Sequence, residues 1–186
     1  MSWYAFGLFL HLTAVVAAFW FANQIHAGVK RLWRAGSSGE ARAACGMIGE
    51  GGRAMPWIGL ALLLTGAYLT QAGWSWTRPW IVLSILGLIV VEGLGGTAGK
   101  RLRAVAARLP AEGAVPADFA AAVRAPYLRA VHYLPTVLVL GVMLIMVMKP
   151  GYAAGIAILV VAAIVGAFAG LRSAPAALRG VGADLH

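Results

Sequence analysis

LFLHLTAVVAAFWFANQIH, residues 8–26, is an apolar run that carries no acidic or basic side chain except two histidines, His11 and His26. A helix needs about 20 mostly apolar residues to cross the hydrocarbon of a bilayer. The whole chain has the same character, since 61% of its 186 residues are hydrophobic and 11% are charged, where soluble domains are about 25% charged. The composition therefore predicts an integral membrane protein.

Five segments are long and apolar enough to be predicted as membrane spans, at about 3–25, 56–73, 79–98, 131–148 and 152–171. They leave little room for a soluble domain. We therefore predict an all-α bundle of five transmembrane helices that forms a single domain over residues 1–175, with a short tail at 176–186. The first span is expected to be retained, because its apolar stretch exceeds the roughly 7–15 residues of a signal peptide core.

Basic residues are concentrated in the loops on one side of these spans. All but Arg78 and Lys149 of the 15 Lys and Arg residues lie there. The positive-inside rule then predicts that the N-terminus is outside and the C-terminus cytoplasmic. This topology accounts for the net charge of +9, so we expect no nucleic-acid partner. The charge asymmetry favours a multi-pass protein of the bacterial inner (plasma) membrane.

The connections on the basic side are longer than those on the opposite side. Residues 35–53 are rich in Gly, Ser and Ala and predict a flexible loop. Residues 101–109 are expected to extend the third span as a helix until Pro110 interrupts it. The stretch PADFAAAVR, residues 116–124, predicts a short amphipathic helix on the membrane surface.

Glycines recur at four-residue spacing in and beside the expected spans. Small residues at this spacing let helix backbones approach closely in lipid. The pattern predicts tight packing inside the bundle, and as an alternative the contact surface of a homo-oligomer or a larger membrane complex. The positions are Gly95, Gly99, Gly151, Gly155, Gly166 and Gly170.

Three ionisable residues are expected on the cytoplasmic side of the bundle. Such residues are costly inside a span and are therefore functional candidates. Glu92 falls in the inner half of the third span, His132 opens the fourth, and His26 ends the first. We predict an inner polar cluster or proton path from these three. The alternative is that Glu92 pairs with a basic loop residue and that both histidines lie at the interface.

His11 is alone at its depth, about 12 Å below the outer surface at 1.5 Å per residue. Thr65, Gly66 and Met143 are expected at the same level. One hypothesis is a haem site with His11 as an axial ligand of the metal, Met143 as the second ligand and Gly66 leaving space for the flat ring. The alternative is an interhelical hydrogen bond from His11 to Thr65.

Short motifs of this chain resemble the HemJ-type protoporphyrinogen oxidases and CopD-like proteins. FLHLTAVVAAFWFANQ (9–24) is similar to their first span, LLLTGAYL (62–69) to their second and LPTVLVLGVMLIMVMKP (134–150) to their fourth. The motif W..RPWI before the third span and the ending MV.KP resemble a related group of small integral membrane proteins of unknown function.

The resemblance implies haem b bound through His11. The oxidases also carry a lysine near the start of the third span, where this chain has Trp76 to Pro79 and no lysine. The resemblance therefore implies haem or porphyrin binding with a redox or tetrapyrrole-related role, and it assigns neither a catalytic residue nor an enzyme class. The alternative is a non-enzymatic membrane component, either a small permease or an accessory subunit, in which His11 is structural.

Overall fold

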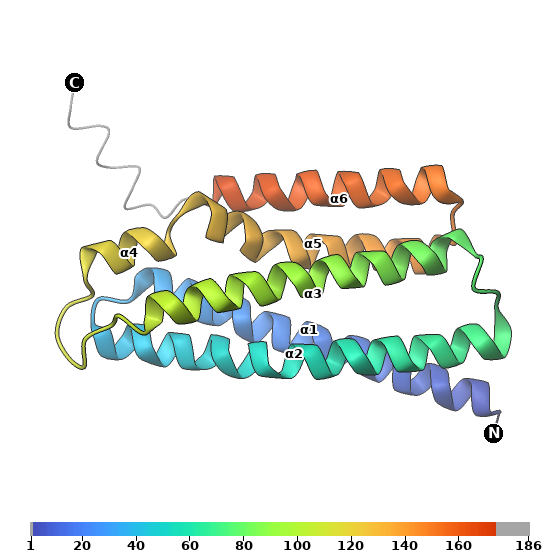
Figure 1. Ribbon diagram of the computed structural model, residues 1–186, viewed down its shortest axis with the longest axis horizontal. Coiled ribbons are helices and arrows are strands. Elements are labelled where there is room, and N and C mark those ends of the chain that lie inside the picture. Colours follow the sequence, from blue (N-terminus) through green and yellow to red (C-terminus); the bar gives the residue numbers. More distant parts are fainter. Residues whose placement is uncertain (1, 174–186) are drawn as a thin grey trace.

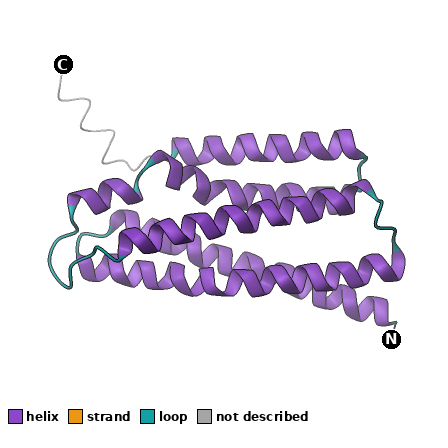
Figure 2. Cartoon of the chain, viewed as in Figure 1, coloured by secondary structure: helices purple, strands orange, loops and turns teal. Residues whose placement is uncertain are grey.

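The computed structural model describes residues 2–173, and within them the regular elements are all helices (Figures 1 and 2). The expected tail at 176–186 lies outside the described residues. The helices are α1 (Trp3–Arg34), α2 (Ser38–Gly73), α3 (Pro79–Ala106), α4 (Ala117–Val123), α5 (Pro126–Met148) and α6 (Tyr152–Arg172).

Four helical segments are long and apolar enough to cross a membrane, namely α1, α3, α6 and the stretch Ala117–Met148 that contains α5. Their large apolar side chains face outward, as Phe9, Val147 and Ile164 show with exposed fractions of 63%, 77% and 62%. A continuous apolar surface of this kind is a membrane contact. The fifth expected span, 56–73, is the C-terminal half of α2, which is the least apolar of the five long helices.

The helices are arranged as an α1–α2 pair beside a group formed by α3, α5 and α6 (Figure 1). Glycines lie where helices meet most closely. A Cβ atom at Gly28 of α1 would lie 2.7 Å from Ile48 of α2, and one at Gly51 would lie 2.7 Å from Ile25 of α1. Close helix approach at glycines is therefore found inside one chain, here at positions other than the six singled out by their spacing.

The prediction of a flexible loop at 35–53 is wrong, because α2 begins at Ser38 and continues without interruption through this region. Ser37 caps the helix by accepting a hydrogen bond from the Glu40 backbone N–H, and Glu40 in turn accepts one from the Gly36 N–H at 2.9 Å. The bond to Ser37 satisfies one of the free N–H groups of a helix start. Ala41 and Ala44 then face α1 and are buried. Small residues here are the contact face of a helix.

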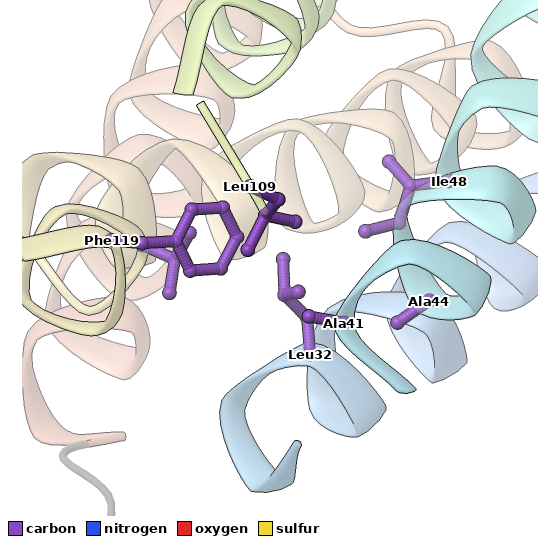
Figure 3. Close-up of a cluster of buried hydrophobic side chains, with 7 residues drawn as sticks. Leu32, Ala41, Ala44, Ile48, Leu109 and Phe119 are labelled. Atoms are coloured by element: carbon purple, nitrogen blue, oxygen red, sulfur yellow. The ribbon is translucent and has the colours of Figure 1, made fainter. Parts of the chain in front are cut away.

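We call the end of the molecule at which α1, α3 and α6 finish the basic end. It holds a cluster of buried apolar side chains that joins α1, α2, α4 and the segment after α3 (Figure 3), and we call this the basic-end cluster: Leu32, Ala41, Ala44, Ile48, Leu109, Phe119 and Val123. The predicted short helix at 116–124 is confirmed as α4. Its apolar residue Phe119 is only 3% exposed, so it packs on this cluster and is not free to enter a lipid surface.

Three arginines of the basic end bind backbone carbonyls at the ends of helices. Arg124 donates to the carbonyl of Trp33 at 2.9 Å and Arg129 to that of Leu171 at 3.4 Å, while Arg42 donates to Leu109. The last carbonyls of a helix have no partner in the helix and carry partial negative charge. These cations therefore tie the ends of α1 and α6 and the segment after α3 each to a neighbouring element, a role beyond setting orientation.

Candidate functional site

A cavity of about 380 Å³ lies between α1, α2, α3 and α5 near the basic end. Its volume is within the roughly 300–1,000 Å³ of small-molecule sites, which combine apolar walls with a few polar groups. Most of its lining is apolar. Its ionisable and hydroxyl side chains, apart from the thiol described below, are His26, Glu92, Lys100, Arg103, His132 and Thr136.

The two histidines of the cavity are in direct contact. His26 Nδ1 lies 2.5 Å from His132 Nε2, and His26 Nε2 lies 2.7 Å from Thr136 Oγ1. His132 and Thr136 are one helical turn apart on α5, so both face α1. Together the three side chains form a continuous hydrogen-bonded chain.

A bond between two imidazole nitrogens needs one donor and one acceptor. One proton is therefore shared between His26 and His132, and whichever ring donates it decides the direction of the bond to Thr136. If both rings carried two protons, two N–H groups would face each other and the bond would be lost. Two arrangements of the shared proton are therefore compatible with these distances.

Glu92 of α3 lines the same cavity. Its carboxylate lies against Gly59 of α2, where an added Cβ would be 2.9 Å from Oε1. Among the described residues Glu92 has no ion pair with a Lys or Arg side chain. The structure thus brings the predicted residues His26, Glu92 and His132 around one cavity.

Sequence reasoning missed the wall that α3 contributes. Glu92, Gly95, Gly96, Gly99 and Arg103 recur at intervals of three and four residues and line the cavity from one face of the helix. A Cβ at any of these three glycines would meet no atom within 4 Å. Glycine lowers helix stability by about 1 kcal/mol relative to alanine, and no contact within the chain offsets that cost here.

Cys45 is the only thiol of the chain, and it also lines the cavity. It is half-buried on the N-terminal part of α2, outside the expected span at 56–73. Burial raises the pKa of the Cys45 thiol above its ordinary value. Because the thiolate is the reactive form, its alkylation at neutral pH is expected to be slow and to accelerate as pH rises.

His11 is only 8% exposed and makes the interhelical hydrogen bond to Thr65, at 2.8 Å. The Thr65 hydroxyl donates to the carbonyl of Ala61 at 2.6 Å, so His11 Nδ1–H is the donor to Thr65 and Nε2 carries a free lone pair. A Cβ at Gly66 would lie 3.5 Å from His11 Cε1. The imidazole itself therefore occupies the space beside Gly66.

Met143 as a second ligand beside His11 stays a prediction, since no contact between the two is recorded among residues 2–173. It lies on α5 with 36% of its surface exposed, while the side-chain contacts recorded between α1 and α5 are at His26 and Trp33. Within residues 2–173 no three His, Cys, Asp or Glu side chains are grouped to bind a metal ion.

Three of the six glycines proposed as an oligomer surface pack inside the chain. A Cβ at Gly155 would clash with the Leu83 side chain, one at Gly166 would meet Leu134 at 2.9 Å, and one at Gly170 would meet Ala130 at 2.5 Å. Nothing lies within 4 Å of such an atom at the other three, Gly95, Gly99 and Gly151. Contact with a second copy or another subunit stays a prediction, and these three positions are the open ones.

No family model, curated protein or solved structure matches the chain. The resemblance to HemJ-type and CopD-like proteins therefore rests on the short motifs alone. What the site does has to be argued from its own chemistry.

Proposed function

We propose that the chain is a five-span protein of the bacterial inner membrane that binds a small molecule in the cavity at its basic end. The four apolar helices and the C-terminal half of α2 supply the five spans. The concentration of Lys and Arg in the loops of one side supports a cytoplasmic basic end and an N-terminus outside. In this orientation the cavity is reached from the cytoplasm or the inner leaflet.

The observation that carries the proposal is that His26, His132 and Glu92 meet at one mostly apolar cavity. Ionisable groups inside spans are retained where they bind a substrate or move protons. The described residues of the cavity do not present a nucleophile held by a base and an orienting group, which is the arrangement of covalent catalysis. A carrier or permease that couples binding to a proton is the form of this function that the shared cavity of the two histidines and Glu92 supports.

Cys45 allows a direct test of orientation and access. A membrane-impermeant maleimide at pH 8 is expected to alkylate Cys45 in inside-out vesicles and not in right-side-out vesicles. Gly99→Leu should slow the reaction, because the new side chain enters the cavity. Gly93→Leu is the matched control, since Gly93 is open and lies outside the cavity lining.

The double variant Cys45→Ala/Gly46→Cys carries an exposed thiol at the neighbouring position. Its alkylation shows which side of the membrane this part of α2 faces. Alkylation of Gly46→Cys from the outside would overturn the orientation. Equal rates for Cys45 in Gly99→Leu and Gly93→Leu would overturn the claim that the thiol is reached through the cavity.

A second candidate function is haem binding at His11, favoured by one observation. Ligand histidines usually donate one ring N–H to a protein group and bind the metal with the other nitrogen, and the His11–Thr65 bond leaves Nε2 in that state. Bound haem would supply one-electron redox chemistry. The contribution of the chain would be to orient the imidazole and exclude water.

Protein purified from cells supplied with a haem precursor tests this candidate. If His11 is the ligand, a Soret band is expected, lost in His11→Ala and shifted in Thr65→Val, which removes the acceptor of the Nδ1–H. The band should persist in Met143→Leu. A preparation without the band, or one in which His11→Ala retains it unchanged, would leave His11 with its structural role alone.

A further inference from the structure

We infer that the cavity at the basic end binds an amphipathic carboxylate, with the carboxylate at Lys100 and Arg103 and the apolar chain against the glycine face of α3. This inference rests on the proposed function, and it adds the class of ligand.

The charges that line the cavity favour an anion. Lys100 and Arg103 are exposed side chains on its lining and have no recorded partner among the described residues. Glu92, the acidic member, is directed against the backbone at Gly59. Arg101, between the two cations in sequence, by contrast has a partner within the chain, because its guanidinium lies 4.3 Å from the centre of the Tyr127 ring.

The walls favour an apolar body attached to that anion. Gly95, Gly96 and Gly99 present bare helix backbone to the cavity, with no protein atom filling the space where their side chains would be. The opposite walls are apolar residues of α1, α2 and α5, including Ile25, Ile48 and Val131. A chain of methylene groups satisfies such walls because it needs no hydrogen bonds.

At the end of the cavity opposite to Lys100 and Arg103, the polar groups are Glu92 and the hydrogen-bonded side chains of α1 and α5. Glu92 is eight residues before Lys100, about 12 Å along the helix, and both ring nitrogens of His26 have partners in His132 and Thr136. A second anionic group at this end of the cavity would face the Glu92 carboxyl. A molecule with one carboxylate and one apolar end therefore matches the cavity better than a dicarboxylate.

Protection of Cys45 from maleimide is the readout, with the full-length protein in neutral phosphatidylcholine vesicles at pH 8. Laurate is expected to slow alkylation, and dodecyltrimethylammonium, which has the same chain length and the opposite charge, is not. Replacing both Lys100 and Arg103 by Gln should weaken protection by laurate about tenfold or more, as expected for loss of charge-assisted bonds. Arg108→Gln, an exposed cation of the same region outside the cavity lining, should leave protection unchanged.

The control for nonspecific effects of laurate on the membrane is the exposed thiol of Gly46→Cys in Cys45→Ala, whose rate should not change. Hexanoate, a shorter carboxylate, distinguishes a ligand drawn from the inner leaflet from a carboxylate of the cytoplasm. Protection by laurate alone supports a ligand drawn from the inner leaflet, and equal protection by hexanoate supports a carboxylate from the cytoplasm.

Protection by the cationic probe as strong as that by laurate would overturn the inference while leaving a cavity that binds small molecules. Absence of protection by all three probes would overturn it as well. The proposed function fails separately, when Cys45 cannot be alkylated from the cytoplasmic side or Gly99→Leu does not slow the reaction.

Discussion

Phe119→Ala is expected to destabilise the basic end of the protein by about 3–5 kcal/mol, the usual cost of truncating a fully buried aromatic side chain. Phe119 is 3% exposed and packs against Leu109 and Leu32 in the basic-end cluster (Figure 3). The helix that carries it, α4, has only seven residues. Since isolated helices this short are not stable in water, its position depends on this contact.

Limited trypsin digestion in detergent and thermal unfolding measure the effect. The variant should be cleaved faster at Arg108, at the start of the loop that leads into α4, and at Arg124, directly after α4, and should unfold at a lower temperature. Phe9→Ala is the matched control, because it removes the same side chain from a position that is 63% exposed. Equal cleavage and equal unfolding temperatures for the two variants would contradict the assigned role of Phe119.

The same variant is expected to affect the cavity. Leu32, Ile48 and Val123 belong both to the basic-end cluster and to the cavity lining, and Cys45 packs against the cluster. Loosening α4 should therefore speed the alkylation of Cys45. The cluster thus forms one wall of the proposed binding site, so the stability of the basic end and ligand binding are physically coupled.

The membrane-crossing helices could be predicted from the sequence because lipid imposes a simple rule on them. A span must be apolar over about 20 residues, and that pattern is visible without knowing which residues touch. The helix at 38–55 could not be predicted in this way. Its Gly, Ser and Ala residues resemble a loop in isolation, and they become a helix face only when Gly28 of α1 allows close contact with Ala44 and Ile48.

The candidate site was predictable to a similar extent. Costly ionisable residues indicated His26, Glu92 and His132, and depth estimates placed them on one side. The contact between His26 and His132 was not predictable, because the spacing of polar residues does not show which helices are neighbours. The face of α3 from Glu92 to Arg103 was readable at intervals of three and four residues, but its glycines fit helix packing equally well until the structure showed open space beside them.

Gly170→Leu is expected to disrupt the contact between α5 and α6. A Cβ at Gly170 would lie 2.5 Å from the Cα atom of Ala130 and 2.6 Å from the carbonyl oxygen of Arg129. Both are backbone atoms, so no side chain can rotate to make room. Inserting atoms into a well-packed contact typically costs about 1–3 kcal/mol, and a backbone contact is at the upper end of that range.

Thermal unfolding in detergent should show a decrease of several degrees, since about 1 kcal/mol corresponds to roughly 2–4 °C for a chain of this size. Gly93→Leu tests whether the decrease comes from the contact, because a Cβ placed at Gly93 meets nothing within 4 Å. Loss of the α5–α6 contact should also move the N-terminal part of α5, where His132 bonds to His26. Gly170→Leu should therefore alter Cys45 protection by laurate although it lies outside the cavity lining, and unchanged unfolding and protection would show that α6 is not held against α5 at this glycine.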